Sequence, residues 1–242
     1  MVLVNVQPPS VIKESEESGE AIICECTEEE FAHELKKYPP TNLYSDEPPL
    51  ETDYHREQID LLIRLLKYFW RDRPDFYISG NLTVYYNAQK IKSRDFRGPD
   101  VFVVMDTEKK DRRSWTIWDE GGKYPNLVIE LLSTSTEKVD RGTKKQLYQD
   151  VWRVPNYFWF HPETLEFAGF HLVDGNYQAI APTETGLLWS EQLELYLGIH
   201  ENQLRWFTAN KDPIPSSEER ADKLEAILRS QGIDPDRIPP TP

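Results

Sequence analysis

A single acidic residue interrupts an otherwise aliphatic stretch near the middle of the chain. Glu130 lies within Leu127-Val-Ile-Glu-Leu-Leu, and its five companions are all apolar. Runs of this kind are typical of strands that are buried on both faces. An unpaired buried carboxylate is costly, so Glu130 is expected to pair with a cation, bind a metal or lie at an opening in the sheet. The alternative is an exposed charge on an edge strand.

Asp100 stands at a comparable position, immediately before a second apolar run. It follows Gly98-Pro99 and precedes Val101-Phe-Val-Val-Met. Alone it would be interpreted as a turn aspartate. Together with Glu130 it is more informative, because acidic residues on two neighbouring strands can converge on a hard divalent cation, which prefers carboxylate oxygen. The pair therefore predicts a site for Mg²⁺ or Mn²⁺.

A third set of polar residues follows Glu130. Asp140, Lys144 and Tyr148 are spaced four apart, which places them on one face of a helix. Most such stripes are solvated charged faces. The functional interpretation puts Lys144 beside the metal, where it would orient the attacking water and offset the negative charge that builds on a phosphoryl group. The basic residues expected to contact nucleic acid lie in the same segment: Lys138, Arg141 and Lys145.

Hydrophobic periodicity predicts the elements that must position these residues. Apolar residues recur at helical period from about 52 to 70, which predicts a long amphipathic helix. A second helix is predicted from about 138 to 151, after a segment rich in helix-capping residues. Strands are predicted at 76–79, 82–86, 101–105, 115–118, 127–132, 157–160, 165–173 and 177–180. This alternation indicates an α/β domain with a mixed central sheet flanked by helices.

The two ends of the chain differ from this central part. Residues 1–20 predict a loose tail, a capping box predicts a short helix near 27–35, and residues 38–50 form a proline-rich loop. Residues 210–217 are typical of a linker, and a final helix follows to about Ser230. Its apolar stripe consists of Ala221, Leu224, Ile227 and Leu228. The predicted division is an N-terminal extension (1–50), the α/β domain (51–209), and a linker with a C-terminal helix (210–242).

The charge of the chain is strongly acidic but unevenly distributed. The 242 residues carry a net charge of −14, which argues against a nucleic-acid partner. Residues 90–145, however, hold 13 Lys and Arg against 10 Asp and Glu, and such a basic zone can still bind a polyanion. Because the sequence shows no membrane-spanning apolar run, no secretory leader and only two cysteines, Cys24 and Cys26, a cytoplasmic location is expected.

Several of these residues belong to short motifs that follow one another in order. The motifs are Gly98-Pro99-Asp100-Val-Phe-Val-Val, Pro125-Asn-Leu-Val-Ile-Glu130-Leu-Leu-Ser133-Thr-Ser135, Asp140-Arg141-Gly-Thr-Lys144, Tyr148, and Val154-Pro155-Asn-Tyr157. Over residues 50–208 this series resembles the Uma-type restriction endonuclease family, within the PD-(D/E)XK nuclease-like superfamily. The resemblance implies a restriction-endonuclease-like fold with extra β-strands, to which the C-terminal helix is appended.

The resemblance also implies roles for individual residues. Asp100 and Glu130 match the metal ligands, and the main-chain carbonyl of Leu131 is a further ligand. The superfamily's usual lysine, two positions after the glutamate, is Leu132 here. Lys144 is therefore the candidate substitute. The auxiliary candidates are Glu57, Gln58, Asp140 and Tyr148. A homodimer is expected from the family and from the apolar stripe of the last helix.

Three functions are compatible with the sequence. The first is a Mg²⁺-dependent endonuclease that hydrolyses phosphodiester bonds in DNA, with Asp100, Glu130 and Lys144 as its catalytic residues. The second is a catalytically inactive interaction module that kept the nuclease fold, which the broken lysine motif and the overall acidity favour. The third is an acid/base hydrolase such as a glycosidase, which would use the same carboxylates without a metal.

Overall fold

The structure is a computed structural model of the 242-residue chain, and it describes residues 11–14, 21–24, 43, 52–87, 97–133 and 140–237. The helix predicted near 27–35, most of the proline-rich loop and Lys138 lie outside these ranges. In the N-terminal extension, β1 (Val11–Glu14) pairs antiparallel with β2 (Ala21–Cys24). The prediction of a loose tail is therefore wrong for residues 11–14, where β-branched residues of two segments pair, as at Ile12 and Ile23.

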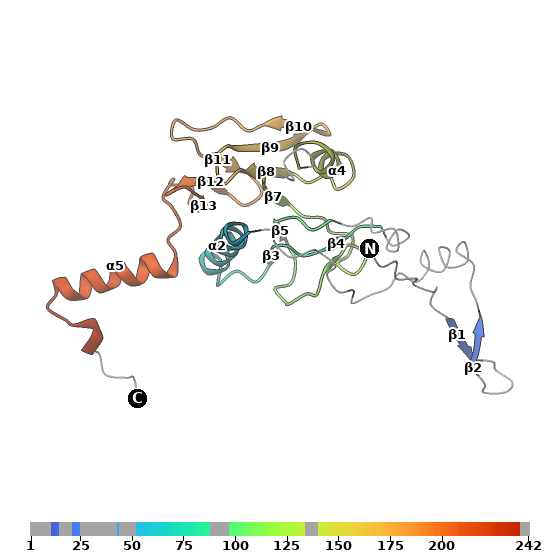
Figure 1. The fold of residues 1–242 in the computed structure, drawn as a ribbon, viewed down its shortest axis with the longest axis horizontal. Coiled ribbons are helices and arrows are strands. Elements are labelled where there is room, and N and C mark those ends of the chain that lie inside the picture. Colours follow the sequence, from blue (N-terminus) through green and yellow to red (C-terminus); the bar gives the residue numbers. More distant parts are fainter. Residues whose placement is uncertain are drawn as a thin grey trace.

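A six-stranded mixed sheet forms the centre of the molecule (Figure 1). Its strands, in spatial order, are β10 (Asn176–Ala179), β9 (Phe167–Val173), β8 (Asn156–Phe160), β7 (Leu127–Leu131), β5 (Val101–Met105) and β3 (Phe76–Ser79). Within this sheet β7 and β8 run parallel, and all the other neighbours are antiparallel. The apolar run that follows Asp100 forms β5, and the run that contains Glu130 forms β7. These two strands are neighbours in the centre of the sheet. The predicted α/β class with a mixed sheet is therefore confirmed.

One face of the sheet is covered by a helix and by a second, smaller sheet. The helix α2 (Asp53–Phe69) begins after Thr52, whose side chain accepts a hydrogen bond from the backbone N–H of His55. The smaller sheet consists of β11 (Leu188–Ser190), β12 (Leu195–His200) and β13 (Gln203–Phe207). The indole Nε1 of Trp206 donates to the carbonyl of Leu62 at 2.9 Å, which fixes this sheet to α2.

The opposite face packs against the crossover between β7 and β8. The crossover contains a π-helical turn, η2 (Asp140–Lys144), followed by α4 (Lys145–Asp150). Tyr148 and Trp152 of this segment share a core with even-numbered residues of β5 and β7, such as Phe102 and Val128. Because successive strand residues point to opposite faces, every even-numbered side chain of these two strands faces the crossover. A short parallel pair, β4 (Val84–Tyr85) and β6 (Trp115–Thr116), completes this side.

The helix predicted from residue 138 differs from the structure at its beginning. Residues 140–144 form a π turn instead of a regular α-helix. The carbonyl of Asp140 accepts a hydrogen bond from Tyr157 Oη at 3.0 Å. A side-chain donor that enters the helical ladder in this way is a recognised cause of irregular turns. The periodicity predicts the helix but cannot predict this long-range contact.

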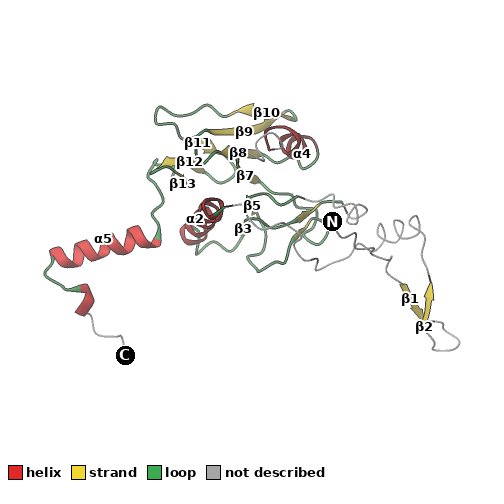
Figure 2. Ribbon diagram, in the orientation of Figure 1, coloured by secondary structure: helices red, strands yellow, loops and turns green. Residues whose placement is uncertain are grey.

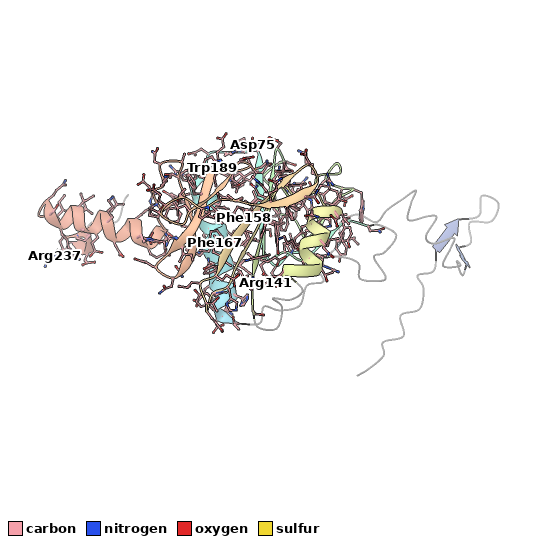
Figure 3. All side chains as sticks on the ribbon, turned by 90° about the horizontal axis from the view of Figure 1, so that it is seen from above. Asp75, Arg141, Phe158, Phe167, Trp189 and Arg237 are labelled. Atoms are coloured by element: carbon pink, nitrogen blue, oxygen red, sulfur yellow. The ribbon has the colours of Figure 1, made fainter. Side chains whose placement is uncertain are left out.

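The C-terminal helix extends away from the rest of the described chain (Figures 2 and 3). The helix α5 (Ser217–Ser230) begins with a capping box between Ser216 and Glu219. Its first turn is held by Arg205, whose NH1 and NH2 groups donate to Glu219 at 3.0 and 2.8 Å. No residue of α5 is buried, and Leu224 and Ile227 of its apolar stripe are exposed. A homodimer formed through this stripe stays a prediction.

In the ranges that the structure covers, none of the helices has both the length and the apolar character that a membrane span requires. The predicted boundaries at residues 50/51 and 209/210, and the cytoplasmic location, stay predictions.

Candidate active site

Asp100 and Glu130 lie opposite each other at the end of two paired strands. Val101 of β5 pairs with Ile129 of β7, so the next position in this register brings Asp100 opposite Glu130. The backbone N–H of Leu131 donates to Asp100 Oδ2 at 2.7 Å and fixes the aspartate at the strand end. The Glu130 side chain has no exposed surface (0%), which excludes its interpretation as an exposed edge charge.

The turn after β3 supports the backbone of Asp100. The N–H of Asn81 donates to the carbonyls of Pro99 and Asp100, each at 3.2 Å. A Cβ atom added to Gly80 would lie 2.5 Å from the carbonyl oxygen of Asp100 and 2.4 Å from Cγ2 of Ile59. Glycine is therefore required at this position, because two backbone segments approach too closely to admit a side chain.

Replacing Gly80 by alanine is expected to lower the free energy of unfolding by about 1–3 kcal/mol, the usual cost of overpacking a closed space. Urea denaturation would measure this loss. Gly142→Ala is the matched control, since nothing lies within 4 Å of a Cβ at Gly142. Equal stability of the Gly80→Ala protein and the parent would show that the turn does not constrain Asp100.

Side chains from the crossover enclose Glu130. The ammonium of Lys144 lies 3.0 Å from Glu130 Oε2 and 2.8 Å from Asp140 Oδ1. The hydroxyl of Tyr148 donates to Glu130 Oε1 at 2.5 Å. Asp140 and Tyr148 are both buried. The polar stripe of the crossover is therefore not a solvated face, and the predicted substitute lysine reaches the glutamate.

The cluster contains more acidic groups than cations. Burial raises the pKa of Glu130 to about 8 despite the opposing effect of Lys144, and the charges of Asp100 and Asp140 raise it as well. Burial also raises the pKa of Asp100, although Lys144 and the N–H of Leu131 act in the opposite direction. Burial alone would lower the pKa of Lys144, but the three carboxylates raise it above its usual value. At neutral pH the lysine is therefore charged, and a proton shared by the carboxyl groups offsets part of the excess negative charge.

This donor set fits a divalent cation. Asp100 and Glu130 offer carboxylate oxygens, which Mg²⁺ and Mn²⁺ prefer. Glu130 lies opposite Asp100 in the strand register, and the charge of Asp100 raises the pKa of Glu130, so the two groups are close enough to serve one ion. A cation would balance the surplus negative charge that a proton now balances. A third protein ligand would come from the main chain at Leu131, whose N–H already contacts Asp100.

A second group of side chains resembles a metal site but has another role. His200, Glu201 and Glu219 are the only three His, Cys, Asp or Glu residues in the described ranges whose ligand atoms all lie within 4.8 Å of one another. The carboxylate of Glu219, however, binds Arg205 and accepts from the backbone N–H of Ser216. We therefore assign this group to the attachment of α5.

The two auxiliary residues predicted on α2 do not meet the carboxylate pair. Gln58 donates to the carbonyl of Leu204 at 2.9 Å and accepts from its N–H at 3.0 Å. Gln58 is bound to β13 instead of the carboxylate pair, because a buried amide must satisfy both of its polar atoms and Leu204 offers a matching backbone N–H and carbonyl. Glu57 is exposed and contributes to the raised pKa of Tyr54, after the larger effect of burial.

Two of the three basic residues predicted to bind nucleic acid, Arg141 and Lys145, make contacts within the protein. Arg141, on the crossover side of the sheet (Figure 3), donates to both oxygens of Glu166 at 2.6 Å. The ammonium of Lys145 lies 3.5 Å from the ring centroid of Phe170. Their role in nucleic-acid binding stays a prediction.

His55 also lies beside the strand end that carries Asp100 and Glu130, although no motif in the sequence points to it. Its Nε2 atom lies 3.1 Å from the carbonyl oxygen of Leu131. The signal available in the sequence is its position, three residues after the N-cap Thr52, on the helix predicted to carry an auxiliary group.

Comparisons with known proteins give one family and two individual similarities. Residues 27–206 match the Uma2 family, described as "Putative restriction endonuclease". The chain is 34% identical over 97 residues to "Uncharacterized protein slr1290" of Synechocystis sp. (strain ATCC 27184 / PCC 6803 / Kazusa), covering 38% of this chain and 48% of that protein. It thus spans about half the length of this curated relative. It is also similar to a solved structure from Anabaena variabilis ATCC 29413, titled a "putative nuclease belonging to DUF820". That similarity has 15% identity and a TM-score of 0.46, and covers 72% of this chain and 95% of the other.

Proposed function

The chain belongs to the Uma2 family, and from this premise we propose that it is a metal-dependent endonuclease that hydrolyses phosphodiester bonds in DNA. One observation carries the proposal: Lys144 contacts the buried Glu130 beside Asp100. Two carboxylates and an ammonium in one cluster are the groups that metal-assisted phosphoryl transfer requires.

Each residue of the cluster has a part in this proposal. Asp100, Glu130 and the main-chain carbonyl of Leu131 would hold Mg²⁺ or Mn²⁺. Such an ion, when bound, lowers the pKa of a coordinated water and stabilises charge on phosphoryl oxygens. Lys144 would orient the attacking water and offset that charge, and Asp140, 2.8 Å from its ammonium, holds it toward the site. Tyr148 fixes Glu130 by donating to its other oxygen.

The position of Lys144 supports an active enzyme over the inactive module. Leu132, where the superfamily has its lysine, is buried in an apolar core together with Val128 and Tyr148. The charge missing from that position is supplied from the crossover. A metal-free glycosidase is less well supported, because hydrolysis by two carboxyl groups gives no role to the ammonium of Lys144, which lies 3.0 Å from Glu130 Oε2.

Nicking of supercoiled plasmid DNA tests the proposal. The purified protein is expected to nick DNA in Mn²⁺ or Mg²⁺, and the activity should be lost with a chelator and in Asp100→Ala. The reason is that Asp100 would supply one of the two side-chain ligands of the metal. Residual nicking in Asp100→Ala at the parent rate would mean that the activity belongs to another site or to a contaminant.

Metal binding is expected to depend on pH. Glu130 has a pKa of about 8 in the folded chain against an ordinary value of 4.5, so folding favours its protonated form. The stability that this group contributes without metal is therefore fully present below about pH 4.5 and is lost as the pH rises through about 8. A metal must displace this proton, so the apparent Mn²⁺ affinity should rise up to about tenfold per pH unit within this window. Calorimetric titration at several pH values measures it, and a flat profile would show that no proton is displaced.

A further inference from the structure

The backbone of Leu131 is held by two hydrogen bonds, one on each of the two peptide groups that flank its Cα. Its N–H donates to Asp100 Oδ2 at 2.7 Å, and its carbonyl oxygen lies 3.1 Å from Nε2 of His55. The two contacts join β7 to the start of β5 and to the first turn of α2. They therefore define the orientation of the two peptide groups around Leu131, at the end of the strand that carries Glu130.

The imidazole of His55 is itself oriented. Its Nδ1 atom lies 2.9 Å from Oγ1 of Thr52, the N-cap residue of α2. A carbonyl oxygen can only accept, so Nε2 carries a proton and donates to Leu131. In the neutral imidazole Nδ1 then accepts from the hydroxyl of Thr52, whose Oγ1 in turn accepts from the N–H of His55. Every polar atom of the ring thus has a defined partner.

This arrangement has a consequence for a metal at Asp100 and Glu130. A carbonyl oxygen has two acceptor sites, and a hydrogen bond to one of them leaves the other in a fixed direction. Outer groups that orient metal ligands typically change metal affinity by about 10–100-fold when they are removed. His55 contacts the predicted main-chain ligand through Nε2, which lies 3.1 Å from the carbonyl oxygen of Leu131.

We propose that His55 is a positioning residue of the metal centre, which acts by orienting the Leu131 carbonyl. This inference rests on the metal centre of the proposed function but not on cleavage of DNA. The histidine does not contact the reacting groups. It orients the carbonyl of Leu131, which is the one proposed protein ligand that a side-chain substitution cannot remove, because it belongs to the main chain.

Titration of the full-length protein with Mn²⁺, followed by calorimetry, tests this role. His55→Ala is expected to weaken Mn²⁺ binding by about tenfold or more. His55→Gln should remain within about threefold of the parent, because the glutamine Nε2 group can donate to the same carbonyl. Arg56→Gln is the control on the same helical turn, where the side chain is 64% exposed and bound to Asp53. It should bind Mn²⁺ as the parent does.

Pulsed electron paramagnetic resonance of bound Mn²⁺ separates positioning from direct ligation. No nitrogen coupling that depends on His55 is expected in the parent. A coupling that disappears in His55→Ala would overturn the proposal, because the imidazole would then be a ligand. Equal affinity of His55→Ala and the parent, or failure of His55→Gln to restore binding, would also overturn it. If the parent binds no Mn²⁺, the metal centre and this inference both fail. If binding follows the expected pattern without DNA cleavage, this inference stands and the nuclease proposal fails.

Discussion

Replacing Glu130 by glutamine is expected to reduce metal-dependent cleavage by about 10³-fold or more, while the metal-free protein keeps at least its original stability at neutral pH. Loss of the metal removes several kcal/mol of transition-state stabilisation, and each 1.36 kcal/mol corresponds to a factor of ten in rate. Stability is maintained because Glu130 is buried and its pKa of about 8 makes it largely protonated near pH 7. Glutamine keeps the acceptor for Tyr148 Oη in the same place, and Lys144, which faces the other oxygen position, keeps Asp140 as its partner.

Two measurements are needed for Glu130→Gln, namely the rate of plasmid nicking and the free energy of unfolding in urea without metal. Glu184→Gln, at an exposed loop position, is the control for removal of one negative charge. A marked loss of stability in the Glu130→Gln protein would mean that the folded chain needs the charged carboxylate. Retained nicking would exclude Glu130 as a metal ligand.

Replacing Lys144 by methionine is expected to have a large effect on folding as well as on activity. The change leaves Glu130 and Asp140 without the ammonium that lies within 3.0 and 2.8 Å of them. Removing one partner of a buried ion pair costs about 3–5 kcal/mol. Nicking should fall by about 10²–10³-fold, the usual effect of losing one group that stabilises transition-state charge.

The loss of stability in Lys144→Met should depend on pH and on metal. Lys144 lowers the pKa values of Glu130 and Asp100, so without the lysine both values rise further and the protein loses stability as the pH increases. Mn²⁺ should restore part of the stability, because a bound cation replaces the missing positive charge. Urea denaturation near pH 5 and pH 8, with and without Mn²⁺, tests both effects, and Lys223→Met on the exposed α5 serves as control. Stability that is insensitive to pH and Mn²⁺ would contradict this account of the cluster.

The carboxylate pair could be predicted because local composition constrains it strongly. Glu130 is anomalous within its own six residues, and the strand pairing that brings Asp100 opposite it follows from two runs that are both buried on two faces. Lys144 could be predicted because residues four apart on a helix share a face, and the π turn preserves this contact with Asp140.

The parts that could not be predicted depend on partners distant in the sequence. The position of Gln58 on α2 predicts a place at the carboxylate pair, but its amide binds the backbone of Leu204, 146 residues away. The sequence does not point to His55 because the partner of its side chain is a backbone oxygen, which no side-chain pattern reveals. The hairpin of β12 and β13 turns at Glu201 and Asn202, which both have positive φ without a glycine. The usual Asn-Gly signature of such a turn is therefore absent.

The parallel pairing of β7 with β8 explains how a lysine outside β7 reaches the glutamate within it. Two parallel neighbours require a crossover, and this one returns over the face to which Glu130 points. A positive charge on the π turn η2 of the crossover therefore reaches the same carboxylate as a charge on the strand itself would reach. A sequence motif with a fixed spacing between glutamate and lysine would therefore miss chains in which the lysine lies on the crossover. Searches that compare positions in space would retain them.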